Sequence, residues 1–150
     1  MRENISKRKN IRLKDYDYSK EGMYFITICT KNRAEILGKI KNINLIELTR
    51  EGRIVQMYLE EIENIFENIV VDEYVIMPNH IHMIITIVRK GNSNISKIMQ
   101  QYKGYVSKKI GYSIWQKLFY EHIIRNEKEY YRVKKYIQSN IINWEKDKYY

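Results

Sequence analysis

Two strand-like runs separated by only two residues constrain the fold of this chain more than any other feature of its sequence. Residues 69–77 and residues 80–88 are rich in β-branched and apolar side chains, and only Pro78 and Asn79 lie between them. Such runs favour extended strands, whereas proline and asparagine favour tight turns. Because so short a connection joins only antiparallel strands, these two runs must form a hairpin.

Two further strands and an irregular hairpin are predicted by composition and by the bounding turn residues. Residues 22–30 and residues 118–124 are short apolar runs of strand character, and residues 34–48 alternate more weakly, as in an irregular hairpin.

Capping residues and helical spacing predict three helices. The first spans residues 49–66 and begins at Thr49, with an apolar stripe that includes Ile54, Met57, Tyr58, Ile62 and Ile65. The second begins at a cap on Ser93 or Asn94 and ends near Ile110, before Gly111. Its inward-facing residues are Ile95, Ile98, Met99, Tyr102 and Val106. The third runs from Glu127 to about Ile141, and Asn126 with Glu129 resembles a capping box.

The order strand, helix, strand, strand, helix, strand is that of a ferredoxin-like fold. We therefore expect an α+β protein with an antiparallel sheet, an inserted hairpin and an extra carboxyl-terminal helix. At 150 residues, with no internal repeat or linker, the chain is expected to form one domain over residues 1–150.

The formal net charge of +9 is concentrated at the amino end and in the last third of the chain. Residues 1–20 carry seven basic and three acidic side chains, and residues 91–112 carry four lysines and no acid. We interpret residues 1–20 as a basic amino-terminal arm. Clusters of this kind favour a polyanion such as nucleic acid, although a surface tuned for solubility explains the charge equally well.

The second predicted helix, which ends near Ile110, is basic. Its lysines could bind the phosphates of single-stranded DNA, and its tyrosines could stack on the bases. An ordinary basic amphipathic helix is an equally good reading of the same pattern. The candidate DNA-binding residues are Lys97, Tyr102, Lys103, Tyr105, Lys108 and Lys109.

The chain shows no sign of export or of membrane insertion. Its single cysteine, Cys29, cannot form an intramolecular disulfide, and no run of residues is long and apolar enough to span a bilayer. No secretory signal is recognisable at the start of the sequence. We therefore expect a cytoplasmic location and no membrane partner.

Two histidines of the hairpin are candidates for a metal site. His80 and His82 are two residues apart on a predicted strand, so both side chains lie on one face, about 7 Å apart along the chain. Both rings could then bind one ion. For a lone pair of this kind, rings held by backbone carbonyls or aromatic neighbours are the more frequent case, because two ligands alone do not make a metal site.

The last predicted helix adds a phenol and an amide. Tyr136 and Asn140 are four residues apart and are expected to lie one above the other on the helix. If this helix covers the histidine face, Tyr136 could approach the ion and Asn140 could supply a third ligand. Taken alone, Tyr136 is better explained as an ordinary residue of an amphipathic helix.

Four segments in this order carry a family resemblance that covers the chain from about Asp15 to its carboxyl terminus. They are VIMPNHIHMII, MQQYKGYVSKKI, IWQKLFYEHIIRNEKEY and KKYIQSN. The chain resembles the single-tyrosine HUH transposases, and in particular the REP-associated tyrosine transposases.

The resemblance implies specific roles. His80 and His82 would hold a divalent metal, Mg²⁺ or Mn²⁺, with Asn140 as a further ligand. Tyr136 would attack a DNA phosphodiester, form a 5′-phosphotyrosine and release a 3′-hydroxyl. Ile141 stands where the family has a proline, so the resemblance does not imply the local chain path after Asn140.

His122 belongs to a family-like segment together with Trp115 and Gln116. His122 could contact phosphate or metal, but a structural histidine is the more frequent case for a polar group near a core. The sequence assigns no chemistry to Trp115 and Gln116.

The favoured function is a metal-dependent transposase or endonuclease that nicks and rejoins single-stranded or hairpin DNA. A host nuclease with the same chemistry, outside any mobile element, is an alternative. A non-catalytic ferredoxin-like module that binds nucleic acid is another, although it leaves His80, His82 and Tyr136 unexplained as a set. The protein could act as a monomer or a homodimer, with the site within one chain or shared between two.

Overall fold

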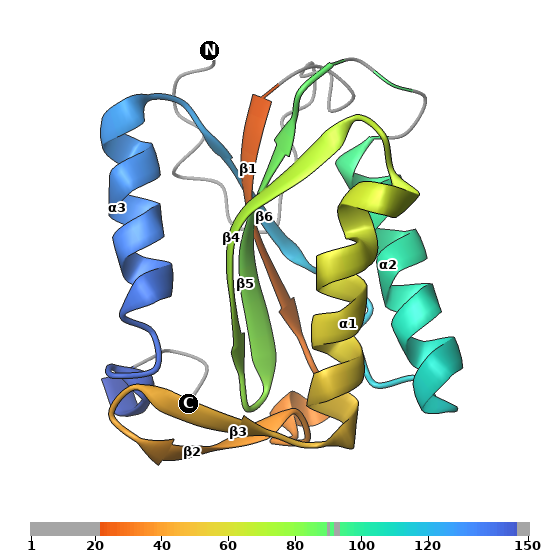
Figure 1. Ribbon diagram of the computed structural model, residues 1–150, viewed down its shortest axis with the longest axis vertical. Helices are drawn as coiled ribbons and strands as arrows, with labels where there is room; N and C mark the ends of the chain where they lie inside the picture. The colour runs from red at the N-terminus through yellow and green to blue at the C-terminus, as the bar shows by residue number, and fades with distance from the viewer. Residues whose placement is uncertain (1–21, 90, 92–93, 147–150) are drawn as a thin grey trace.

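The computed structural model describes residues 22–89, 91 and 94–146, so the predicted basic arm over residues 1–20 lies outside the described residues. A four-stranded antiparallel sheet in the order β4-β5-β1-β6 forms its centre (Figure 1). The strands are β1 (Gly22–Cys29), β4 (Ile69–Met77), β5 (His80–Ile87) and β6 (Tyr120–Ile124). This order and the intervening helices confirm the predicted α+β, ferredoxin-like fold.

The predicted hairpin of β4 and β5 is the centre of this arrangement. Its pairing runs from Ile69 opposite Ile87 to Met77 opposite His80, with one irregularity between Val71 and Glu73. Strand β5 also pairs with β1 along its whole length, so β5 is a central strand.

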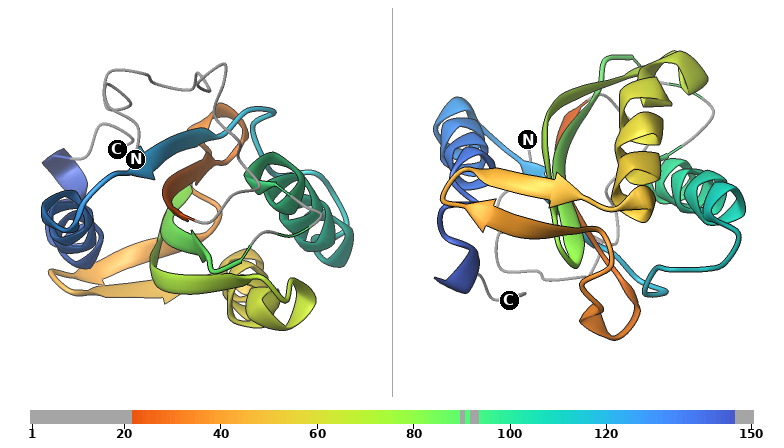
Figure 2. Two further views of the ribbon diagram at one scale, coloured as in Figure 1. Left: turned by 90° about the horizontal axis from the view of Figure 1, so that it is seen from above. Right: turned by 60° about the horizontal axis from the view of Figure 1, so that its bottom comes forward.

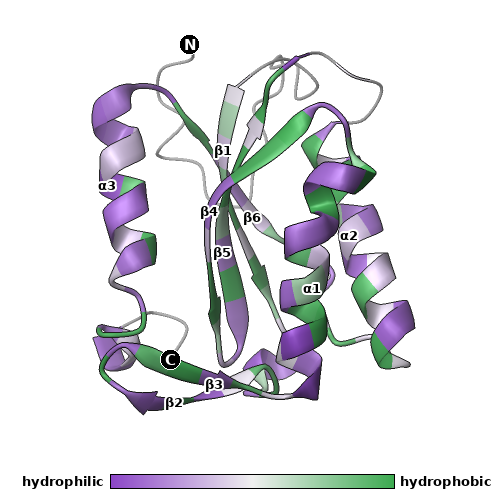
Figure 3. Cartoon of the chain, viewed as in Figure 1, coloured by the Kyte–Doolittle hydropathy of each residue, from purple (hydrophilic) through white to green (hydrophobic). Residues whose placement is uncertain are grey.

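Helices cover both faces of the sheet. Helices α1 (Arg50–Ile65) and α2 (Ile95–Ile110) lie on one face, and α3 (Glu127–Gln138) lies on the other (Figures 1 and 2). Figure 3 shows hydrophilic and hydrophobic bands alternating along these helices, as expected of helices that cover a core with one side. Within the described part of the chain, no helix combines the length and the apolarity needed to cross a membrane.

The predicted helix starts are confirmed by side-chain caps. The side chain of Thr49 accepts a hydrogen bond from the Gly52 amide, and Asn94 and Asn126 do the same for residues three positions further on. Helix α2 ends at Gly111, whose φ of 107° is in the left-handed region that glycine adopts without strain.

Alternation along the strands divides the core into two layers. The layer between the sheet and helices α1 and α2 is the larger one. It includes Tyr24, Ile26, Ile28, Val55, Leu59, Ile62, Ile81, Met83, Ile85, Ile98, Met99, Tyr102 and Val106. The smaller layer lies under α3 and consists of Ile84, Ile124, Val133 and Ile137, flanked by Met23, Phe25, Val75 and Tyr130.

The buried stripe of α1 differs from the predicted one. Met57 and Ile65 are 42% and 39% exposed, whereas Val55 and Leu59 are buried with Ile62. Met57 lies two residues from Val55, which places it about 200° further around the helix. The sheet covers only one side of α1, so an apolar residue at that angle stays in contact with solvent.

Two element boundaries also differ from prediction. Strand β6 begins at Tyr120, and Leu118 before it is 71% exposed. Helix α3 ends at Gln138 and is followed by a turn and a short 3-10 helix, η3 (Trp144–Lys146). The Ser139 hydroxyl donates to the Lys135 carbonyl oxygen at 2.8 Å, a local bond of the kind that competes with continued helix.

The predicted irregular hairpin forms a separate two-stranded sheet, β2 (Gly38–Asn42) and β3 (Leu45–Leu48), after a short 3-10 helix, η2 (Lys31–Arg33). It lies at the lower end of the molecule in Figure 1. The Leu37 amide donates to the Pro78 carbonyl oxygen at 2.9 Å, which ties the base of this hairpin to the β4–β5 turn.

Gly52 on α1 and Gly104 on α2 provide a paired test of how closely α1 packs against Leu37. A Cβ at Gly52 would lie 1.9 Å from the Leu37 carbonyl oxygen, whereas one at Gly104 meets nothing within 4 Å. Gly52→Ala should therefore lower the free energy of unfolding by roughly 1–3 kcal/mol through overpacking. Gly104→Ala should raise it by about 0.5–1 kcal/mol through helix propensity.

Denaturant unfolding of both variants, followed by circular dichroism, measures these changes. Equal effects of the two substitutions would contradict the close approach of α1 to Leu37.

Candidate active site

The two histidines of β5 face α3 and are buried. His80 and His82 are the first and third residues of the strand, and their exposed fractions are 0% and 1%. Their Nε2 atoms are 3.1 Å apart and their ring centroids are 4.5 Å apart. The two imidazoles therefore converge on one point through the same type of nitrogen.

The second nitrogen of each ring has its own partner. Nδ1 of His80 lies 2.7 Å from Oδ1 of Asn79, and Nδ1 of His82 lies 2.7 Å from the Thr27 hydroxyl oxygen. Thr27 is opposite His82 in the β1–β5 pair. Phe25, two residues earlier on the same face, lies 5.3 Å from the His82 ring. Both rings are therefore held in orientation through their Nδ1 atoms, and their Nε2 atoms face each other.

Tyr136 meets this pair from the other side. Its hydroxyl oxygen is 3.4 Å from Nε2 of His82, and the two rings are 5.2 Å apart. The Phe25 ring packs edge-on against Tyr136 at 6.1 Å. Tyr136 is 38% exposed, so its hydroxyl group can meet both the histidines and an incoming substrate. Nucleophile candidate and histidine pair come together within a single chain.

Asn140 does not lie one helical turn above Tyr136, so that prediction is wrong. Helix α3 ends at Gln138, and Asn140 occupies the following turn. It is nevertheless only 2% exposed, and its Oδ1 has no hydrogen-bond partner among the described residues. Trp144, the first residue of η3 after this turn, stacks on His80 with the ring centroids 6.1 Å apart. Asn140 therefore lies in the sequence between two residues that contact the histidine pair.

The donor atoms fit a divalent cation. Two Nε2 atoms converge, and both rings are held through Nδ1. Asn140, in the turn between Tyr136 and Trp144, has a buried amide oxygen without a hydrogen-bond partner among the described residues. No cluster of three or more His, Cys, Asp or Glu side chains with metal-binding geometry occurs in the described ranges. A cation here would keep positions for water or substrate oxygen, as catalytic metal sites do.

The predicted DNA-binding residues of α2 fall into different groups. Lys97, Lys108 and Lys109 are exposed, and Tyr105 is 40% exposed with its ring stacked on Tyr58. Nζ of Lys103, by contrast, donates to two backbone carbonyl oxygens, those of Gln116 and Lys117, at 2.7 and 3.1 Å. Partial burial lowers the pKa of Lys103. Lys103 therefore anchors the segment before β6.

Two predicted DNA-binding residues, Tyr102 and His122, are buried, so their assignment is wrong. Tyr102 is 1% exposed and donates its hydroxyl hydrogen to the Val55 carbonyl oxygen at 2.9 Å. Burial raises the pKa of Tyr102 well above its ordinary value. His122 is 7% exposed, and its Nε2 lies 2.8 Å from a carboxylate oxygen of Glu129. Neither ring can stack on a base or reach a phosphate.

The pair of His122 and Glu129 attaches α3 to β6. Burial alone would raise the pKa of Glu129, but hydrogen bonds from the Arg125 amide and from His122, with the charges of both residues, hold it below its ordinary value. Glu129 is therefore ionised at neutral pH although it is buried.

The basic helix and the histidine site lie on opposite faces of the sheet. Helix α2 packs on the face of Ile81 and Met83, whereas His80 and His82 point to the face that α3 covers (Figure 2). At the α2 side the sheet ends with edge strand β6, which is five residues long.

Several residues of the site escaped sequence analysis. Asn79 was read only as a turn residue, Thr27 and Phe25 only as strand residues, and Trp144 received no role. Their contacts depend on the β1–β5 register and on the turn after α3, neither of which a single sequence specifies. Two sequence signals could have pointed to these residues. Thr27 is a hydroxyl residue inside an apolar strand, and Asn79 directly precedes His80.

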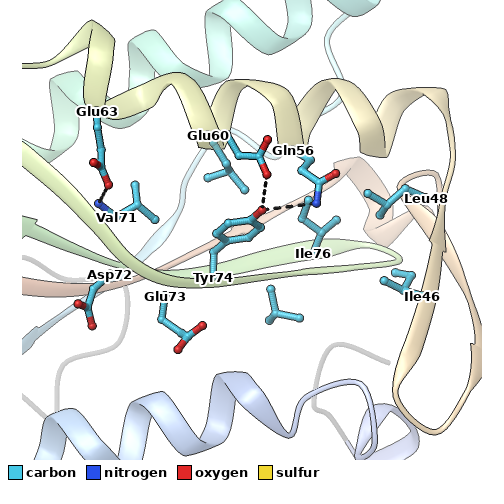
Figure 4. A pocket seen from close by; sticks show the side chains of 12 residues that line it. Ile46, Leu48, Gln56, Glu60, Glu63, Val71, Asp72, Glu73, Tyr74 and Ile76 are labelled. Atoms are coloured by element: carbon cyan, nitrogen blue, oxygen red, sulfur yellow. Dashed lines mark hydrogen bonds between the residues drawn. The ribbon is translucent and has the colours of Figure 1, made fainter.

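A cavity of about 620 Å³ lies between α1, β4 and β3, and its lining includes none of the site residues described above (Figure 4). Its lining includes Glu60, Glu63, Asp72 and Glu73, and the Tyr74 hydroxyl donates to Glu60 at 3.2 Å. Four carboxylates would repel a phosphate backbone. A smaller cavity of about 480 Å³ adjoins the site, because Pro78 and Trp144 belong to its lining.

Comparisons with known proteins indicate the family of this chain. The family described as "Transposase IS200 like" matches residues 18–140. An uncharacterised protein of Haemophilus influenzae is 39% identical over 97% of this chain and 94% of its own length. The REP-associated tyrosine transposase of Escherichia coli is 29% identical over 82% of this chain and 68% of its own length.

Solved structures show the same relationship. The structure of a REP-associated tyrosine transposase bound to a REP hairpin has a TM-score of 0.65 and 25% identity, over 85% of this chain and 70% of that chain. A crystal structure of a Deinococcus radiodurans protein, at 15% identity and a TM-score of 0.53, shares the fold alone. The resemblance to REP-associated tyrosine transposases is therefore confirmed, and the chain belongs to the IS200-like transposase family.

Proposed function

We propose that this protein cleaves and rejoins single-stranded or hairpin DNA through Tyr136. In this proposal His80, His82 and Asn140 hold a divalent cation, Mg²⁺ or Mn²⁺. One observation carries it: the Tyr136 hydroxyl oxygen lies 3.4 Å from Nε2 of His82, at the point where the two imidazoles converge.

Tyrosine chemistry accounts for the strand transfer. The Tyr136 oxygen attacks a DNA phosphorus and forms a new P–O bond, while the bond from phosphorus to the 3′-oxygen breaks. The phenol proton passes to solvent, and the leaving 3′-oxygen takes up a proton and becomes a hydroxyl. The product is a 5′-phosphotyrosine, and attack by a 3′-hydroxyl reverses the reaction and rejoins DNA.

A cation at this place would compensate for the weak nucleophile. Tyrosine ionises only near a pKa of about 10, so a neutral phenol is the form present at physiological pH. A bound divalent cation would neutralise the charge of the attacked phosphate and polarise its oxygens. The half-exposed ring of Tyr136, held between Phe25 and His82, keeps the attacking oxygen beside this position.

DNA as the partner is supported by charge and by a relative. The net charge is +9, and a structural relative is bound to a REP hairpin. The exposed lysines of α2 are suited to phosphate contacts along a strand that continues round β6 to the opposite face.

Tyr136→Phe tests the nucleophile. The substitution removes one oxygen and keeps the ring packing, so DNA binding should persist while cleavage and the covalent adduct disappear. Labelled single-stranded and hairpin oligonucleotides, copied from DNA that flanks the gene, are incubated with protein and resolved on denaturing gels. Tyr131→Phe is the matched control, because Tyr131 is also on α3 but 57% exposed.

An adduct that survives Tyr136→Phe would identify another nucleophile, with exposed Tyr105 the next residue to test. If wild-type protein binds these oligonucleotides but forms no adduct with any of them, the non-catalytic binding module becomes the better description.

His80→Ala and His82→Ala test the cation. Each should lower cleavage by at least about a hundredfold, because the phosphate would lose its charge compensation. EDTA should do the same to the wild-type protein, and added Mn²⁺ or Mg²⁺ should restore activity. Circular dichroism and DNA binding serve as controls for folding. Full activity in EDTA would remove the cation from the mechanism.

The salt dependence of DNA binding tests α2. On single strands, log affinity falls against log salt with a slope of roughly −0.7 per phosphate contact, because each contact releases counterions. Changing Lys97, Lys108 and Lys109 together to Gln should make the slope less negative by about 2 and weaken all sequences alike. Lys103 is left unchanged because its Nζ holds backbone carbonyls. Cleavage by saturating protein should remain.

An unchanged slope would place the DNA on another surface. Deletion of the basic arm, which includes Lys7, Arg8, Lys9 and Arg12, would then be the next measurement.

A further inference from the structure

We infer that Asn79 and Thr27 are positioning residues for the histidine pair. Asn79 fixes the proton of His80 on Nδ1, and Thr27 holds the His82 ring while allowing its proton to occupy either nitrogen. The inference rests on the proposed function, in which the two Nε2 atoms bind a cation.

The amide of Asn79 has a defined orientation. Its Nδ2 donates to the Arg33 carbonyl oxygen at 3.5 Å, while its backbone oxygen accepts from the Thr30 amide at 3.0 Å. With the amide reversed, Oδ1 would face the Arg33 carbonyl oxygen, and two acceptors would meet. The side chain is 2% exposed, so water cannot take the place of these partners.

This orientation decides the protonation pattern of His80. Oδ1 of Asn79 lies 2.7 Å from Nδ1 of His80, and a carbonyl oxygen can only accept. Nδ1 of the neutral ring must therefore carry the hydrogen. The lone pair of His80 is left on Nε2, the nitrogen that faces His82 at 3.1 Å.

Thr27 acts differently, because a hydroxyl group can donate or accept. Without a cation, the lone pair of His80 Nε2 requires His82 to carry its hydrogen on Nε2, and Nδ1 of His82 then accepts from Thr27. To bind a cation, His82 must present a lone pair on Nε2, so its hydrogen has to lie on Nδ1 and Thr27 has to accept. Thr27 satisfies both arrangements at the same 2.7 Å contact.

The surroundings of the two rings explain why such anchors matter. Both rings are fully or almost fully buried, and His80 stacks on Trp144 while His82 contacts Phe25 and Tyr136. These aromatic contacts restrain the ring planes but do not distinguish Nδ1 from Nε2. The polar partners on Nδ1 are what make the two Nε2 atoms the available ligands.

Calorimetry of Mn²⁺ binding to the full-length protein without DNA tests the two roles. It is done at about pH 8, above the pKa of about 6.5 of an unperturbed imidazole. Thr27→Val keeps the side-chain shape and removes the hydroxyl, so it should weaken affinity by roughly 10- to 100-fold. Thr27→Ser keeps the hydroxyl and should bind like the wild-type protein. Asn79→Ala removes the acceptor for Nδ1 of His80 and should weaken binding similarly.

Thr86→Val is the matched control. Thr86 lies on the same face of β5 as His82, four residues further along, and should leave Mn²⁺ affinity unchanged when replaced. Thermal unfolding of each variant without metal shows whether it is folded. Equal Mn²⁺ affinity of folded Thr27→Val and wild-type protein would overturn the role of Thr27 and leave the proposed function intact.

Imidazole ¹⁵N chemical shifts give a second readout that a purely structural role would not change. His80 should carry its hydrogen on Nδ1 both without metal and with Zn²⁺ as a diamagnetic probe. His82 should change from the Nε2–H form to the Nδ1–H form when Zn²⁺ binds. A His80 ring protonated on Nε2 in the metal-free protein would overturn the role of Asn79.

Failure of the proposed function has a separate signature. If wild-type protein binds neither Mn²⁺ nor Zn²⁺ at millimolar concentration, the histidine pair is not a cation site and both proposals fall.

Discussion

The antiparallel pairing of β5 with β1 is the interaction on which the rest of the structure depends. It makes β5 a central strand, so one face of β5 must be apolar and packs on α1 and α2. The opposite face carries His80 and His82 in a buried position, where polar groups need partners. The same register supplies one of them, because it places Thr27 opposite His82. The pairing that builds the core therefore also orients the candidate ligands.

The position of Tyr136 depends on how α3 is attached. Val133 and Ile137 pack on Ile84 and Ile124 in a small apolar layer, which by itself leaves α3 some freedom to slide. The buried pair of His122 and Glu129 adds a directional contact between α3 and β6. Apolar packing buries surface between α3 and the sheet, whereas a charge-assisted hydrogen bond between two defined atoms fixes where the helix lies along the sheet. Together they hold the phenol within hydrogen-bonding distance of His82.

Local patterns predicted most of the fold and part of the site. The hairpin around Pro78, the caps at Thr49, Asn94 and Asn126, and the shared face of His80 and His82 all follow from short-range spacing. The end of α3 was missed, because a helical pattern continues past Ser139 although the backbone does not.

Long-range contacts set the limits of that prediction. Tyr102 fits both a buried stripe and a stacking surface, and only the packing of α2 on α1 decides between them. A single sequence does not contain this information.

The placement of α2 and Tyr136 on opposite faces of the sheet has a mechanical consequence for a nucleic acid that touches both. Such a molecule would have to bend around an edge of the sheet, whereas duplex DNA stays nearly straight over a persistence length of about 50 nm. An unpaired strand makes that turn easily, so under the proposed function this placement would favour a cut in an unpaired segment beside a duplex.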